Sequence, residues 1–173
     1  AKRVLIHYGG GSAVKSGLIG RLTADLEQHG MTVITLGGVK PNPRDTEVYA
    51  GIELVRRENI DFILAVGGGS AIDSSKAIAH GACYDGDFWD FFCGKAKPET
   101  TMPFGAVLTT SAAGSESSNS CVIMQERTLI KRGLTSELNR PRIAFMDPEL
   151  AMTVPKYQIA SGAMDILAHI MER

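Results

Sequence analysis

The apolar residues of this chain fall into short runs that alternate with segments in which they recur at helical spacing. We predict β-strands at four of these runs, which in chain order are Val4–Tyr8, Thr32–Leu36, Asp61–Val66 and Pro103–Leu108. Between the first two strands Leu18, Leu22 and Leu26 recur every four residues, which predicts a helix with one apolar face. This repeated alternation is typical of a parallel sheet with helices on both faces. The pattern therefore predicts a doubly wound, Rossmann-like α/β fold.

The pattern changes in the last third of the chain. Ile143–Met146 is predicted to be a fifth strand, and before it Cys121–Met124 is predicted to form half of a hairpin, followed by an exposed polar stretch at Arg127–Arg132. From Tyr157 onward the apolar residues again recur at helical spacing. We therefore expect an α/β domain over residues 1–150 and the start of an all-helical second domain over residues 151–173.

The balance of charge excludes several classes of partner. The chain has 18 Lys and Arg residues against 19 Asp and Glu residues, which gives a formal net charge of −1 and speaks against nucleic-acid binding. No cationic amphipathic segment indicates a membrane surface, and no apolar run reaches the length of a membrane span. Cys83, Cys93 and Cys121 form no C-x-x-C pair, so we interpret them as reduced thiols. We expect a cytoplasmic protein without nucleic-acid or membrane partners.

Aromatic residues gather at Phe88–Phe92, beyond the helix that is predicted after the third strand. A hydrophobic plug over the sheet is the favoured interpretation of this cluster, since large apolar side chains usually pack in the core. The wall of a substrate site is the alternative.

Two glycine clusters follow predicted strands, at Gly9–Ser12 and at Gly67–Ser70. Glycine lets a backbone turn sharply and approach a ligand without a Cβ in the way. The first turn of the helix that follows presents unpaired N–H groups, which favour an anion. We predict a phosphate site at the second cluster. The alternative is a tight turn under a capped helix, because Ser70 and Asp73 have the spacing of a capping box.

A third loop, Thr109-Thr110-Ser111, leaves the fourth predicted strand and brings hydroxyl groups to the same end of the sheet. Taken by itself, such a cluster is more often an ordinary polar loop. No loop matches the G-x-G-x-x-G dinucleotide fingerprint. Three loops that converge at the carboxyl ends of parallel strands nevertheless favour a nucleotide as the ligand.

A pair of possible metal ligands lies near the end of the chain. Asp165 and His169 are four residues apart in the predicted helix, so their side chains leave the same face. A carboxylate oxygen and an imidazole nitrogen suit Fe²⁺ or Zn²⁺. An isolated pair of this kind is more often a surface contact, and two ligands are fewer than the three that catalytic metals normally have.

The motifs together resemble those of the iron-containing (group III) alcohol dehydrogenases, and among these the butanol-dehydrogenase-like, NADPH-dependent aldehyde reductase branch. The matching stretches occur in the order of that family and are Tyr8–Gly17, Gly37–Pro43, Leu64–Lys76, Leu108–Glu116, Pro141–Leu150 and Gly162–Glu172. The resemblance implies a dehydroquinate-synthase-like fold. It also implies residues before Ala1 and an all-helical domain beyond Arg173.

The resemblance implies a role in cofactor binding for residues in four of these regions. Gly68, Gly69 and Ser70 would bind the cofactor, the last two at its pyrophosphate, with Asp73 nearby. The nicotinamide side would be lined by Thr109, Thr110 and Ser118, the cofactor ribose would be reached by Lys131, and the adenine-side ribose would lie over Gly37 and Gly38. One departure from the family pattern is Ala113, where a threonine is usual, which removes a hydroxyl group near the phosphates.

The end of the second predicted strand bears on the choice of cofactor. An acidic residue at this position usually binds the ribose 2′-hydroxyl and repels a 2′-phosphate. Here the sequence is Gly37-Gly38-Val39-Lys40, with no acid and one cation. We therefore predict that NADP(H) is preferred over NAD(H), with Lys40 among the cofactor-binding residues.

The resemblance implies an oxidoreductase that transfers hydride between NADP(H) and a primary alcohol or aldehyde such as butanol or butyraldehyde. Asp165 and His169 would act in catalysis by holding a divalent metal, Fe²⁺ or Zn²⁺, that polarises the substrate oxygen. Two further histidines would come from the C-terminal domain, and we expect a homodimer. The alternatives are a nucleotide-binding segment without catalysis and a non-redox enzyme of the dehydroquinate-synthase-like fold.

Overall fold

The computed structural model describes residues 1–112 and 114–172 and contains a five-stranded parallel sheet in the order β2-β1-β3-β4-β7. Its strands are β1 (Arg3–Gly9), β2 (Thr32–Val39), β3 (Phe62–Gly67), β4 (Phe104–Leu108) and β7 (Ile143–Phe145). All four neighbouring pairs are parallel. The predicted doubly wound sheet is confirmed, and so is the fifth strand.

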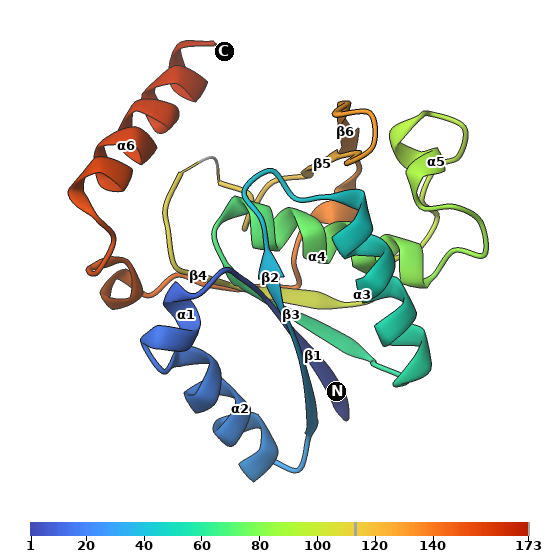
Figure 1. Ribbon diagram of the computed structural model, residues 1–173, viewed down its shortest axis with the longest axis horizontal. Helices are drawn as coiled ribbons and strands as arrows, with labels where there is room; N and C mark the ends of the chain where they lie inside the picture. The colour runs from blue at the N-terminus through green and yellow to red at the C-terminus, as the bar shows by residue number, and fades with distance from the viewer. Residues whose placement is uncertain (113, 173) are drawn as a thin grey trace.

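Helices cover both faces of this sheet (Figure 1). One face carries α1 (Ser12–Lys15) and α2 (Leu18–Gln28), and the other carries α3 (Asp45–Arg57) and α4 (Gly69–Ala82). The division follows from strand geometry, because alternate residues of a strand point to opposite faces. Val4 and Ile6 of β1 pack in the cluster that contains Leu18 of α2, whereas Leu5 packs in the cluster that contains Val48 of α3.

The predicted hairpin is present as a second sheet of two antiparallel strands, β5 (Ser120–Met124) and β6 (Lys131–Thr135). The predicted exposed stretch at Arg127–Arg132 is confirmed, although Lys131 and Arg132 already belong to β6. Beside this hairpin lies the short helix α5 (Trp89–Phe92), whose aromatic side chains are buried in the core shared with α3 and α4. The burial of these side chains favours the interpretation of the cluster as a hydrophobic plug and not as the wall of a substrate site.

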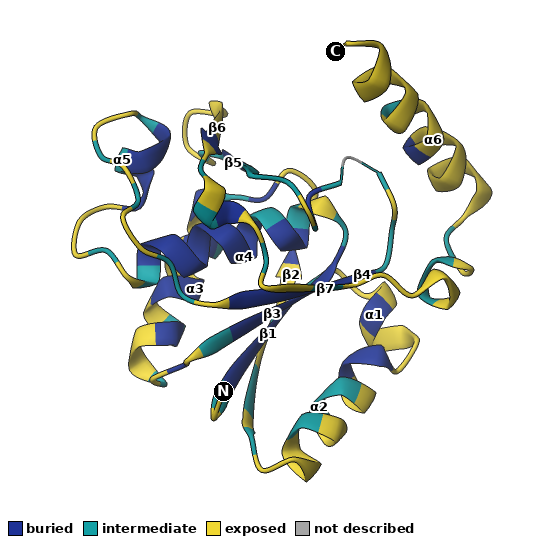
Figure 2. Cartoon of the chain, turned by 180° about the vertical axis from the view of Figure 1, so that it is seen from behind, coloured by how far each residue is buried: buried dark blue, intermediate teal, exposed yellow. Residues whose placement is uncertain are grey.

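The final helix of the chain stands apart from the α/β layers (Figure 2). Two 3₁₀ turns, Glu137–Asn139 and Pro148–Ala151, flank β7, and α6 (Lys156–Met171) follows. Gly162 is the single buried residue of α6, all of whose residues are described. Its exposed large apolar side chains are Tyr157, Ile159, Met164, Ile166, Leu167, Ile170 and Met171. A domain boundary at residue 150 stays a prediction. Among the described helices none is both long and apolar enough to cross a membrane.

Candidate functional site

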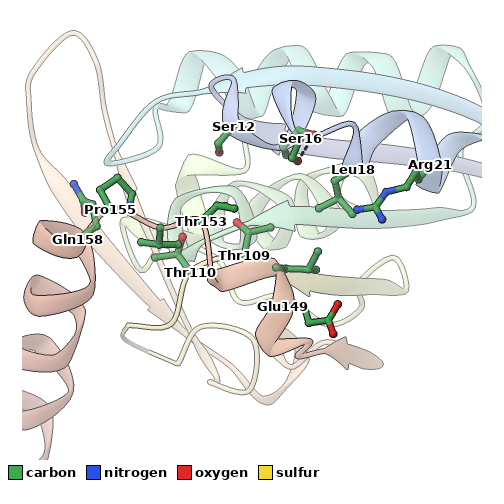
Figure 3. Close-up of a pocket in the computed structure, with 13 residues that line it drawn as sticks. Ser12, Ser16, Leu18, Arg21, Thr109, Thr110, Glu149, Thr153, Pro155 and Gln158 are labelled. Carbon is green, nitrogen blue, oxygen red and sulfur yellow. Dashed lines mark hydrogen bonds between the residues drawn. The ribbon is translucent and has the colours of Figure 1, made fainter.

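The loops that follow β1 and β4 meet at one end of the sheet, together with the segment that leads into α6. A pocket of about 410 Å³ lies between them, bordered by Ser12 at the start of α1, by Thr109 and Thr110 after β4, and by Thr153, Pro155 and Gln158 near the start of α6 (Figure 3). The strands are parallel and in register, so their carboxyl ends lie at the same edge. The convergence predicted from the sequence is confirmed for these loops.

The glycine loop between β3 and α4 borders the same region. Thr109 N–H donates to the Gly67 carbonyl at 3.1 Å, which ties the loop after β4 to the glycine loop. Gly67 has a φ of 154°, and a Cβ on it would lie 2.9 Å from Cβ of Ala71, so the fold itself requires glycine there. A Cβ on Gly68 would lie 3.6 Å from Cβ of Thr110, and one on Gly69 would lie 3.9 Å from Cβ of Ser115. The fold thus has room for side chains at Gly68 and Gly69.

The start of α4 has the properties of an anion site. Its N-cap is Gly68, no side chain caps the helix, and the N–H groups of Gly69 and Ser70 are bonded to none of the described residues. The capping box proposed for Ser70 and Asp73 is wrong, because Ser70 lies inside the first turn. Free N–H groups and the positive end of the helix dipole both favour a negatively charged group.

Asp73 faces the β5–β6 hairpin. Its Oδ1 accepts from the Ser115 hydroxyl at 2.6 Å, and its Oδ2 accepts from Val122 N–H at 3.0 Å. Burial raises the pKa of this carboxyl, against the effect of its hydrogen bonds and of the Lys76 ammonium group. In the structure Asp73 therefore holds Ser115 and Val122 against α4. Its expected position near the pyrophosphate stays a prediction.

Gly37 and Gly38 lie at the end of β2, and the connector that follows them is held by two contacts from the hairpin. A Cβ on Gly37 would overlap the ring of Tyr8, and Gly38 has a φ of 93°, so both positions favour glycine. Lys40 Nζ lies 3.3 Å from Oε1 of Glu126 in the turn after β5. Further along the hairpin, Lys131 Nζ donates to Asn42 Oδ1 at 2.8 Å. Lys40 and Lys131, both predicted to bind cofactor, therefore lie close to this connector.

Ser118 belongs to the loop between β4 and β5. The Ser118 side chain is half-buried, and its hydroxyl donates to the Ser120 carbonyl at 3.3 Å. Ala113, where we expected a missing hydroxyl, lies outside the described residues.

Asp165 and His169 lie on the same face of α6, as their spacing predicts. His169 Nε2 is 3.8 Å from Asp165 Oδ1, and both side chains are about half exposed, at 56% and 46%. The described residues contain no group of three His, Cys, Asp or Glu side chains arranged to hold a metal ion. The pair offers one oxygen and one nitrogen donor, which fits two positions of a divalent metal site.

The sequence analysis missed two features of the site. One is the buried side chain of Lys76, and the other is the ion pair between Glu126 and Lys40. Lys76 is fully buried within α4. A signal for it exists in the sequence, since it is the one charged residue between Asp73 and Asp85. Nothing in the sequence pairs Glu126 with Lys40, because 86 residues separate them.

Comparisons with known proteins give the family. The family model described as iron-containing alcohol dehydrogenase matches residues 1–148. The chain is 46% identical over 172 residues to the probable NADH-dependent butanol dehydrogenase 1 of Bacillus subtilis, covering 99% of this chain and 44% of that protein. It is 38% identical over 174 residues to the NADPH-dependent aldehyde reductase YqhD of Escherichia coli, covering 99% and 44%.

A solved structure that matches this chain closely carries a name of the same kind as these relatives. The NADH-dependent butanol dehydrogenase A of Thermotoga maritima matches with a TM-score of 0.95 and 42% identity, over 99% of this chain and 43% of that chain. The chain thus spans about 44% of the length of the curated relatives that it matches. On the family match over residues 1–148 and the fold and site described above, the chain belongs to the iron-containing alcohol dehydrogenase family.

Proposed function

We propose that the full-length protein is an oxidoreductase that transfers hydride between NAD(P)(H) and a primary alcohol or aldehyde, with Fe²⁺ or Zn²⁺ polarising the substrate oxygen. The observation that carries the proposal is the open space over Gly68 and Gly69 at the uncapped start of α4. The names of the relatives support the same chemistry, since they describe butanol dehydrogenases and an aldehyde reductase. The homodimer stays a prediction.

Each part of the site would contribute a separate task. The N–H groups of Gly69 and Ser70 would bind the pyrophosphate, as free amides at a helix start do. Thr109 and Thr110, which border the pocket beside this loop, would orient the nicotinamide. Asp165 and His169 would hold the metal together with ligands from outside the described residues. When bound, the metal supplies Lewis acidity and the cofactor supplies the hydride chemistry.

A second hollow supports a substrate with a short alkyl chain. It measures about 370 Å³, adjoins the first pocket at Thr110, and has mainly apolar walls from α6 and the turn before it, including Met152, Ile159 and Ile166. Apolar walls with few polar groups are typical of sites that bind small organic molecules.

For the cofactor we propose a preference for NADP(H). The segment Gly37–Lys40, at the end of β2, carries no carboxylate to repel a 2′-phosphate, and the Lys40 side chain is 59% exposed. Glu126 competes for the Lys40 ammonium group, because its carboxylate already lies 3.3 Å away. The relatives include both NADH-dependent and NADPH-dependent enzymes.

The experiment that tests the proposal compares the 173-residue chain with the full-length protein. We expect the full-length protein to retain a divalent metal through dialysis and to oxidise butanol or reduce butyraldehyde. The 173-residue chain should bind NAD(P)H but hold metal weakly and show no turnover, because Asp165 and His169 provide only two ligands. Stoichiometric metal with turnover in the short chain would contradict the ligand assignment. A full-length protein that binds NAD(P)H without turnover would favour a nucleotide-binding module.

A further inference from the structure

Lys76 of α4 places its ammonium group inside the protein, against the loop between β4 and β5. Its Nζ donates to the Ser115 carbonyl at 2.8 Å, the Ser115 hydroxyl at 3.0 Å, the Ser118 carbonyl at 3.2 Å and the Ser120 carbonyl at 2.7 Å. The side chain of Lys76 is 0% exposed. An ammonium group has three protons to donate, so these oxygen atoms occupy its full capacity and leave none for a ligand.

Asp73, three residues earlier on the same helix, binds the same segment. It accepts from the Ser115 hydroxyl at 2.6 Å and from Val122 N–H at 3.0 Å, and its Oδ1 lies 3.8 Å from Lys76 Nζ. The Ser115 hydroxyl thus lies between the two charged groups. Together these contacts fasten residues 115–122 to α4.

The same helix begins at the glycine loop, so α4 connects the two halves of the proposed cofactor site. Its first turn carries the free N–H groups of Gly69 and Ser70, and its second turn carries Asp73 and Lys76. The segment that Lys76 holds continues the loop that starts at Thr109 and Thr110. We propose that Lys76 is a positioning residue for the nicotinamide half of the cofactor. This inference rests on the proposed function.

The cost of burying a charge explains why removing Lys76 should disturb mainly the segment that it contacts. Taking a cation out of water is costly unless each of its protons finds an acceptor, and removing the cation leaves those acceptors unpaired. Without Lys76, the carbonyl groups of Ser115, Ser118 and Ser120 would have to turn toward water. The glycine loop makes none of these contacts with Lys76, and it is fixed by the backbone bond from Thr109 to Gly67 and by the helix itself.

The test uses the full-length protein with Lys76→Met, which keeps a side chain of similar length without charge. We expect its affinity for NAD(P)H to fall about tenfold or more, the size of losing a charged hydrogen bond, while that for ADP changes less than about threefold. ADP carries the pyrophosphate but no nicotinamide, so a purely structural role would leave the ratio of the two affinities unchanged. Fluorescence titration with NAD(P)H and calorimetry with ADP give both constants.

Ile78→Val is the matched control, since Ile78 is a fully buried residue of the same helix that packs toward Gly51 of α3. It should lower stability and leave both affinities unchanged. If Lys76→Met does not fold, Ser115→Ala removes the hydroxyl shared by Asp73 and Lys76 and should weaken NAD(P)H relative to ADP in the same direction.

If a folded Lys76→Met protein keeps the wild-type ratio of the two affinities, this inference is overturned and the proposed function is not. Ser115→Ala gives the same test if Lys76→Met does not fold. Failure of the unmodified protein to bind NAD(P)H would overturn the proposed function, and this inference with it.

Discussion

Gly162 of α6 lies against the carbonyl group of Ser111 so closely that a Cβ on Gly162 would be 2.6 Å from the carbonyl oxygen. Ser111 belongs to the loop after β4 whose Thr110 borders both pockets. Asp165 and His169 follow Gly162 on the same helix, so this contact links the helix that carries the proposed metal ligands to the loop that borders the proposed cofactor site.

We expect Gly162→Ala to displace α6, because the overlap is with a backbone atom and no side-chain rotation can relieve it. Overpacking of this kind costs about 1–3 kcal/mol. Turnover of the full-length protein should fall, whereas its metal content should change little, since Asp165 and His169 move together. Ser161→Ala, at the exposed neighbouring position, is the control and should leave turnover unchanged. Wild-type turnover in Gly162→Ala would show that α6 does not depend on this contact.

The second prediction concerns Gly69. A valine there has room within the fold, because its Cβ would meet nothing closer than Cβ of Ser115 at 3.9 Å. Its branched side chain would occupy the space proposed for the pyrophosphate. Gly69→Val should therefore lose NAD(P)H binding in a fluorescence titration while its circular dichroism spectrum stays unchanged. Gly20→Val in α2, where a Cβ also meets no neighbour, should keep binding. Unimpaired binding by Gly69→Val would place the cofactor elsewhere.

The third prediction uses the pair formed by Lys40 and Glu126. Glu126→Gln frees the Lys40 ammonium group for a 2′-phosphate and should raise the ratio of kcat/KM for NADP(H) to that for NAD(H) several-fold. Lys40→Asp should lower the same ratio, since a carboxylate at the end of β2 favours a 2′-hydroxyl and repels a 2′-phosphate. Steady-state kinetics with both cofactors give the ratio. If neither substitution changes it, the ribose does not lie at this connector.

The sequence predicts those features of the site that are made by residues close together in the chain, and it misses those made by residues far apart. Local apolar runs predict the strands of the sheet. The convergence of the glycine loops is also predictable, because parallel strands end at one edge of the sheet. The contacts of Lys76 join residues 39 to 44 positions apart, and a helical pattern does not say which loop a buried cation will meet. The capping box was wrong because Gly68 and not Ser70 is the N-cap, and the Asp73 carboxylate accepts instead from Ser115 and Val122, more than 40 residues away along the chain.

The last prediction concerns His7, a buried residue of β1 that holds β2 and α4 together. Its Nδ1 lies 2.8 Å from the Leu36 carbonyl, which can only accept, so Nδ1 carries the proton and donates it. Its Nε2, 2.8 Å from the Ser74 hydroxyl, is therefore the acceptor of that hydroxyl proton. Burial lowers the pKa of His7 from 6.5 to about 4, so the native imidazole is neutral at physiological pH.

The sign of the pH dependence follows from that shift. Between pH 6.5 and about 4 the unfolded imidazole takes up a proton that the native one resists, so the free energy of unfolding falls as the pH falls. From about pH 7 to about pH 5 the loss due to His7 should be about 2 kcal/mol. His7→Asn, whose amide can still donate to the Leu36 carbonyl, should lose this part of the slope in urea unfolding. His29→Asn, at the exposed end of α2, should keep it. A slope as steep in His7→Asn as in the wild type would assign the acid sensitivity to other groups.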